Sequence, residues 1–203
     1  CLPSDYRPTV ARVLEALAGA ADQGDGFADY AAAAARLRRS GLRNEDRVFD
    51  NRGVGKSDKP AGPYTTKLFA QDTKALVDEL DLSDFHLLGV SMGGMIAQEY
   101  ALAHPADLRS LTAACTYAAP GPFCSRMFSM WQEMAPVMGL KTVMQDVTLW
   151  AFTQEFFETR EAELAEFEEA MGSLPQPVDA YLAQLSSIQT HDTTDRLTQI
   201  AAP

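Results

Sequence analysis

Apolar residues follow two different spacings in the middle of the chain, and the spacing separates strands from helices. Residues 85–90 are almost continuously apolar and have the length of a strand, a pattern typical of a central strand buried on both faces of a parallel sheet. Residues 108–116 form a second strand-like run. Between the two runs, residues 93–104 are apolar nearly all round and stop before Pro105, which predicts a buried helix. Strand, helix and strand at this spacing predict a βαβ unit with a parallel sheet.

The residues before this unit predict mostly helix. Residues 9–18 and 27–40 read as helices, the second closed by Gly41. Residues 65–80 carry apolar positions at helical spacing with charged residues between them, so we expect an amphipathic helix there. A short strand at 47–49, followed by a loop of glycines and small polar residues over 50–58, is the one strand we expect ahead of this helix.

The chain changes character beyond Pro120. Strand-like runs give way to many methionine and aromatic residues, so we expect residues 120–190 to be a helical cap inserted into the α/β domain. One helix is predicted over 155–171, where an apolar stripe is surrounded by seven glutamates and a solvated face is expected. The apolar cap residues are expected to be mainly core and lid packing.

The predicted organisation has three parts. Residues 1–119 form a partial α/β core, in which 1–46 carry no convincing strand; 120–190 form the cap; and 191–203 form a helix returning to the core. Both ends of the chain indicate an incomplete reading frame. The chain starts with Cys1 instead of methionine, and it stops at 200–203, where the approach to a new strand begins.

Charge and cysteine content narrow the partners and the compartment. The chain has 17 basic and 28 acidic residues among 203, a net charge of -11, so it is not expected to bind nucleic acid or an anionic membrane surface. No apolar run approaches the roughly 20 residues that span a bilayer, and no secretory signal opens the chain. The three cysteines show no C-x-x-C pair or histidine spacing, which argues against a disulfide framework and a zinc site and favours a reducing, cytoplasmic compartment. No metal or dissociable cofactor is expected.

The segment Gly89-Val-Ser-Met-Gly93 directly follows the first predicted strand and has the form G-x-S-x-G. In this setting the pattern indicates a nucleophile elbow, which exposes Ser91 on a sharp strand-to-helix turn. Gly89 and Gly93 are expected to let the backbone pack without a Cβ clash. The turn aims the backbone N–H of Met92 at the oxyanion that forms when a serine attacks a carbonyl, assisted by the N-terminus of the following helix.

Residues 49–58, 89–98 and 103–111 together resemble α/β-hydrolase fold enzymes of the esterase, lactonase and peptidase type, and the similarity is strong over 46–119. The resemblance implies a triad of serine, acid and histidine, with the acid after the next strand and the histidine near the C-terminus. Both implied positions lie beyond the 203 residues. It also makes Asp50 and Arg52 part of a scaffold loop beside the site.

Few other residues of the chain are candidates to replace these partners. An acid directly after the second strand, an arrangement known in some members of the fold, is excluded because residues 115–120 contain no aspartate or glutamate. His86, His104 and His191 lie at element positions where a histidine is usually structural or solvated, His191 being the least unfavourable base. The second oxyanion donor has only residues 23–27 as a match, and a surface loop is the favoured interpretation there.

Two functions follow. The leading hypothesis is a hydrolase of carboxylic esters or lactones that forms an acyl-enzyme at Ser91 with a small apolar substrate; a serine at the elbow argues against the dehalogenase and epoxide hydrolase chemistry that the fold runs with an aspartate. The alternative is a catalytically incomplete fragment or a hydrolase-like protein that binds a ligand without turnover. The particular substrate and the oligomeric state stay open.

Overall fold

The computed structural model describes residues 49–203. The helices predicted at 9–18 and 27–40, the loop at 23–27 and most of the strand predicted at 47–49 lie outside the described residues. Phe49, the one residue of that strand within them, has no regular secondary structure.

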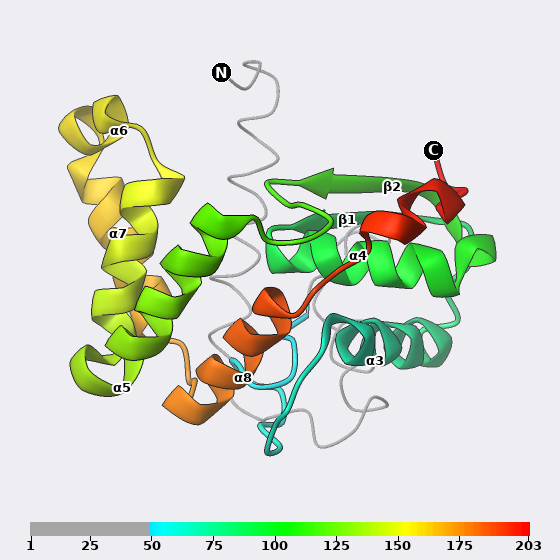
Figure 1. The fold of residues 1–203 in the computed structure, drawn as a ribbon, viewed down its shortest axis with the longest axis horizontal. Helices are drawn as coiled ribbons and strands as arrows, with labels where there is room; N and C mark the ends of the chain where they lie inside the picture. Colours follow the sequence, from blue (N-terminus) through cyan, green and yellow to red (C-terminus); the bar gives the residue numbers. More distant parts are fainter. Residues whose placement is uncertain (1–48) are drawn as a thin grey trace.

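The predicted βαβ unit is present and defines the centre of the fold. Strands β1 (Phe85–Val90) and β2 (Leu108–Ala114) pair in parallel, and helix α4 (Met92–Ala103) and the 3-10 turn η2 (Pro105–Asp107) connect them (Figure 1). Parallel pairing places the ends of both strands at one edge of the sheet, because Val90 lies opposite Ala114. The residues that follow β1 and β2 therefore come close together at that edge.

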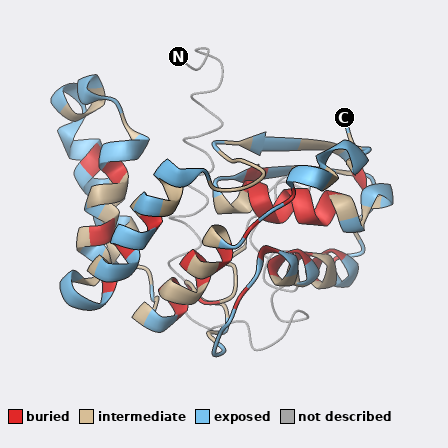
Figure 2. Ribbon diagram, in the orientation of Figure 1, coloured by how far each residue is buried: buried red, intermediate tan, exposed pale blue. Residues whose placement is uncertain are grey.

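Helix α4 lies between the sheet and helix α3 (Thr66–Glu79), so the core is layered as sheet, α4 and α3 (Figure 1). Residues Gly94 to Ala101 of α4 are all buried, as Figure 2 shows. The predicted amphipathic helix is confirmed as α3, which begins after Thr65, whose hydroxyl accepts a hydrogen bond from the Leu68 N–H. The helix places Phe69 against Tyr100 and Leu108 in the main core cluster.

The expectation that β1 is buried on both faces is wrong for the described part of the chain. Gly89 is buried and Phe85 and Leu87 pack on the core, whereas Leu88 and Val90 are 52% and 50% exposed. Successive side chains of a strand point to opposite faces, and no described helix covers the face that carries Leu88 and Val90. Among the described elements, α4 covers one face of the strand and none covers the other.

The predicted helical character of residues 120–190 is confirmed. Four helices occupy the segment, and we call them together the α5–α8 segment: α5 (Pro122–Ala151), α6 (Gln154–Thr159), α7 (Glu161–Gly172) and α8 (Val178–Gln189). α5 packs against both α7 and α8, and its contact with α8 is built around Trp131, Val143 and Tyr181. It bends at Gly139, whose φ of 81° and ψ of 163° lie outside the helical region.

The single helix predicted over 155–171 is two helices. Arg160, at φ -134° and ψ 33°, ends α6 and precedes α7. The break lets aromatic side chains from both helices meet Phe152: its ring centroid lies 4.6 Å from that of Phe156 and 5.5 Å from that of Phe167. The spacing of the apolar residues is compatible with one unbroken helix, so it did not predict the break at Arg160.

The returning segment, predicted as a helix within 191–203, forms the 3-10 helix η3 (Thr194–Gln199). Its two ends are fixed close to the core. The Thr193 N–H donates to the Ala118 carbonyl at 2.8 Å, and the Pro203 carbonyl accepts from the Leu111 N–H at 2.9 Å. The last residues thus lie beside β2, in agreement with the predicted approach to a strand.

Candidate active site

Ser91 lies on the sharp turn between β1 and α4. Its φ of 54° and ψ of -121° are unusual for a residue with a side chain, and such a conformation costs on the order of 1–3 kcal/mol. Hydrogen bonds on both sides hold it: the Ser91 N–H donates to the Ala114 carbonyl at 3.0 Å, and its carbonyl accepts from the Gly94 N–H at 2.9 Å. Ser91 is exposed. The backbone therefore presents its hydroxyl to solvent at the end of the strand.

The glycines of the motif do different work. A Cβ on Gly89 would lie 2.2 Å from the Gly93 carbonyl oxygen, so only glycine fits position 89 in this geometry. For Gly93 the predicted steric reason is wrong, since a Cβ built there has no described atom within 4 Å apart from the adjacent residues and the backbone of its own helix. Gly94 is constrained instead, because its Cβ would lie 2.6 Å from the Thr116 side chain. The elbow thus packs tightly through Gly89 and Gly94.

Met92 is the first residue of α4, and no described residue accepts a hydrogen bond from its backbone N–H. The N-terminus of a helix carries a partial positive charge, so this donor suits a developing oxyanion. The Met92 side chain is directed elsewhere. The Ser187 hydroxyl of α8 lies 3.8 Å from its sulfur, which brings the α5–α8 segment into contact with the elbow.

The loop at 50–58 is held by its own polar residues, as the resemblance implied for Asp50 and Arg52. The Asp50 carboxylate accepts from the Lys56 backbone N–H at 2.9 Å. Arg52 pairs with Asp72 of α3 through two nitrogens, each 2.5 Å from a carboxylate oxygen. The Arg52 carbonyl accepts from the Gln184 amide of α8 at 2.7 Å. The loop therefore connects α3 to α8.

None of the three histidines hydrogen-bonds to Ser91 in the described structure. His86 is on the open face of β1, where its Nδ1 lies 2.7 Å from the Ser110 hydroxyl. His104 ends α4, with its ring centroid 5.1 Å from that of Tyr100. His191 is 2% exposed, and its Nδ1 lies 2.9 Å from the Thr66 hydroxyl. Burial lowers the pKa of His191, which favours a neutral, structural imidazole.

Sequence reasoning missed the polar residues that fasten α4 to the returning segment. Gln98 and Glu99 are both 5% exposed, although they belong to a helix that the pattern described as apolar nearly all round. The sequence did contain a sign of this contact. Two adjacent polar residues in a buried helix need buried hydrogen-bond partners.

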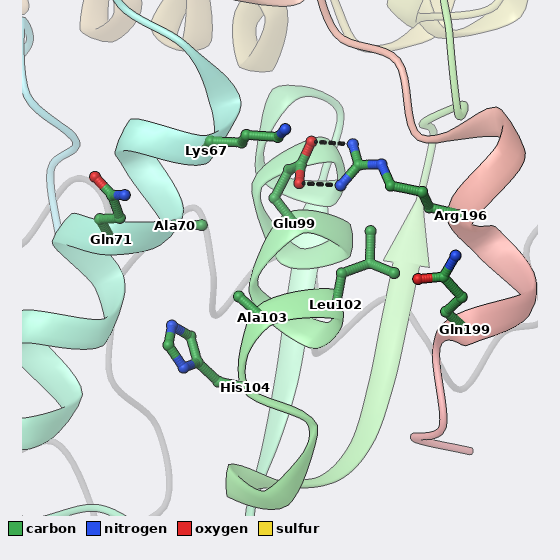
Figure 3. Close-up of a pocket in the computed structure, with 9 residues that line it drawn as sticks. All are labelled: Lys67, Ala70, Gln71, Glu99, Leu102, Ala103, His104, Arg196 and Gln199. Atoms are coloured by element: carbon green, nitrogen blue, oxygen red, sulfur yellow. Dashed lines mark hydrogen bonds and ion pairs between the residues drawn. The ribbon is translucent and has the colours of Figure 1, made fainter.

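A cavity of about 280 Å³ lies between α3, the second half of α4 and η3 (Figure 3). Across it, the Arg196 guanidinium donates to both carboxylate oxygens of Glu99, at 2.8 and 2.7 Å. The described residues that line the cavity include none of the elbow. The cavity is therefore separate from the candidate nucleophile.

Residues 49–203 contain no group of three or more histidine, cysteine, aspartate or glutamate side chains that could hold a metal ion. The helices of this same part include none with the length and apolar character to cross a membrane.

The chain belongs to the alpha/beta hydrolase fold family, whose model matches residues 47–197. It is 28% identical over 160 residues to "Putative carbamate hydrolase RutD" of Pseudomonas syringae, covering 77% of this chain and 61% of that protein. It is also 28% identical over 160 residues to 3-oxoadipate enol-lactonase 2 of Acinetobacter baylyi, covering 76% of this chain and 57% of the relative.

A thermophilic esterase from Thermogutta terrifontis, solved with malate bound, shares the fold with a TM-score of 0.69 and 24% identity. The match covers 88% of this chain and 66% of the esterase. The chain thus spans about three-fifths of the length of the curated relatives named above.

Proposed function

We propose that this chain carries the nucleophile of a serine hydrolase acting on carboxylic esters or lactones. The Ser91 Oγ attacks the substrate carbonyl carbon, and the hydroxyl proton passes to a general base. The resulting oxyanion is stabilised by the Met92 N–H and the N-terminus of α4. Collapse of the intermediate expels the alcohol, with its proton, and leaves an acyl-enzyme that water cleaves to the acid and free Ser91.

One observation carries the proposal: an exposed serine is held in a strained turn at the end of a parallel strand and at the start of a buried helix. This is the geometry that a G-x-S-x-G elbow requires. The two curated relatives support the reaction class, because the activities in their names, carbamate hydrolase and enol-lactonase, both cleave a bond at an acyl carbon.

The remaining parts of the machinery belong to the proposal as well. The triad acid and histidine are not assigned to described residues, since no described histidine or acid hydrogen-bonds to Ser91. In this proposal the α5–α8 segment is the cap over an apolar acyl pocket, and residues 49–119 and 191–203 belong to the core. The cysteine pattern supports a cytoplasmic location.

The second candidate is a chain that binds an acyl ligand without turning it over. Its support is that no histidine or acid hydrogen-bonds to Ser91 among residues 49–203. Loss of triad partners typically lowers turnover by several orders of magnitude, so the 203-residue chain alone is expected to be nearly inactive.

Hydrolysis of short p-nitrophenyl esters and of a matched p-nitrophenyl carbamate tests both candidates. Turnover is expected from the full-length gene product that contains this chain, and Ser91→Ala should abolish it. Ser110→Ala is the matched control. Unlike Ser91, Ser110 does have a histidine partner, because the His86 Nδ1 lies 2.7 Å from its hydroxyl. A full-length protein that is inactive on every ester would favour the ligand-binding candidate. Activity that survives Ser91→Ala would refute the assignment of the nucleophile.

A further inference from the structure

Helix α4 carries two adjacent polar side chains in its most buried stretch. Gln98 and Glu99 are each 5% exposed. A polar group buried without a partner costs on the order of 1–3 kcal/mol, so both residues need hydrogen bonds that justify their position. Both find them on the segment that returns from α8 to β2: Gln98 at Thr193, and Glu99 at Arg196.

The Gln98 amide contacts both connections between the core and the α5–α8 segment. Its Nε2 donates to the Tyr117 carbonyl on the outgoing connection at 3.2 Å. Its Oε1 accepts from the Thr193 hydroxyl on the returning connection at 2.5 Å. The two connections also bond to each other, since the Thr193 N–H donates to the Ala118 carbonyl at 2.8 Å. The Gln98 side chain of α4 thus bonds to both connections that link the α5–α8 segment to the core.

The hydrogen atoms in this cluster can be assigned from the partners. Thr193 has one hydroxyl hydrogen, and both Gln98 Oε1 and the Ala118 carbonyl accept from it. The His191 Nε2 lies 3.4 Å from the Thr193 oxygen, and a neutral ring that carries its proton on Nε2 fits this arrangement. The neutral ring then accepts at Nδ1 from the Thr66 hydroxyl at 2.9 Å. A directed chain runs from the start of α3 through His191 and Thr193 to Gln98.

The neighbouring ion pair fixes the same segment. Arg196 donates to both oxygens of Glu99, and its guanidinium also donates to the Asp192 carbonyl at 2.8 Å (Figure 3 shows the pair). The guanidinium therefore ties residue 192 to α4 one position away from Gln98. Thr193 and Arg196 hold this segment to α4 through Gln98 and Glu99, and His191 joins it to Thr66 at the start of α3.

We propose that Gln98 is a positioning residue that sets the α5–α8 segment over Ser91, acting through Thr193. The inference rests on the proposed function, in which this segment shapes the acyl pocket. Gln98 lies seven residues beyond Ser91, about 10 Å along the helix, so it touches no reacting atom. Its anchoring reaches the elbow through α8, whose Ser187 hydroxyl lies 3.8 Å from the Met92 sulfur.

Hydrogen exchange of the full chain tests the anchoring without using activity. Thr193→Val keeps the shape and removes the hydroxyl, and Gln98→Leu removes both amide bonds. Each should speed exchange in residues 115–121 and 190–193 by about tenfold or more, because local opening becomes easier. Thr193→Ser restores the hydroxyl and should exchange like the wild type. Thr198→Val changes an exposed threonine of η3 and serves as the matched control.

Kinetics of the full-length protein test the positioning role. Thr193→Val should raise the KM for a long-chain p-nitrophenyl ester about fivefold and change kcat less than twofold, because it alters the pocket and not the chemistry. Ser91→Ala should do the reverse: it abolishes turnover and leaves exchange in 115–121 unchanged. If Thr193→Val exchanges like Thr198→Val, the positioning proposal is overturned, whatever the esterase result. If only the Ser91→Ala result fails, the proposed function falls and the anchoring stands.

Discussion

The elbow and the α5–α8 segment show two ways in which a sequence determines structure. At the elbow the backbone passes so close to itself that glycine is required at Gly89, and a short motif is enough to predict the geometry. In the α5–α8 segment the helices pack through large side chains. The chain changes direction at Gly139, within α5, and at Arg160, between α6 and α7. A turn in which backbone segments touch can therefore be predicted from a short glycine motif. The positions at which packed helices bend or end are not predicted by the spacing of their apolar residues.

The largest effect on stability is expected from Gly89→Ala. Its new methyl group would lie 2.2 Å from the Gly93 carbonyl oxygen, so the turn must shift. We expect the free energy of unfolding to fall by about 3 kcal/mol or more, measured by urea denaturation. Gly93→Ala is the matched control, because its methyl group meets no described atom within 4 Å apart from the adjacent residues and the backbone of its own helix. Equal losses in the two variants would contradict the packing described for the elbow.

The next effect is expected from Gly139→Ala in α5. Here the methyl group has open space, but the φ of 81° and ψ of 163° belong to a region that is essentially restricted to glycine. The expected loss in the free energy of unfolding is about 2 kcal/mol, from backbone conformation alone. An unchanged urea midpoint would mean that α5 continues straight through residue 139.

Asp146→Ala tests a polar contact within the same segment. Its carboxylate accepts from the indole N–H of Trp131 at 2.6 Å and from that of Trp150 at 3.1 Å. Trp131 is 8% exposed, so its N–H would lose its acceptor in a buried place, at a cost of about 1–2 kcal/mol. Lys141→Ala removes an exposed ion pair with Glu169 and should leave the urea midpoint unchanged. A loss that is the same in both variants would argue against the buried indole contact.

The smallest effect on stability is expected from the titration of His191, which lies on the connection from α8 back to the core. Burial lowers its pKa in the folded protein below the ordinary value of 6.5, so the unfolded chain binds the proton more readily. The contribution of this imidazole to stability is therefore fully present above pH 6.5 and is lost as the pH falls toward the lowered pKa. Glu99, Arg196 and Asp192 are the charged groups that act on the ring.

Thermal unfolding between pH 5 and pH 8 measures this effect. The wild type should lose more stability on acidification than His191→Gln, which has no imidazole to titrate. Identical pH profiles for the two proteins would show that the ring is not kept neutral by burial.

The sequence was sufficient for the βαβ unit because residues 85–90 are an apolar run of strand length and the helix that follows them ends at a proline. It also predicted the sharp turn at Ser91 between β1 and α4, whereas the roles of Ser91 and Met92 in catalysis stay predictions. It failed on the open face of β1, since an apolar strand does not reveal whether a helix covers Leu88. It also missed Gln98, whose partners Tyr117 and Thr193 are distant in the chain and are brought together only by the fold.

The central claim is that Ser91 is the nucleophile, and mapping the adduct of a fluorophosphonate probe tests it most directly. The full-length protein is labelled, digested and examined by mass spectrometry, with Ser91→Ala and Ser110→Ala treated alongside. One adduct is expected, on Ser91; Ser91→Ala should abolish it and Ser110→Ala should leave it intact. A folded full-length protein that takes no label, or that is labelled at another serine, would contradict it.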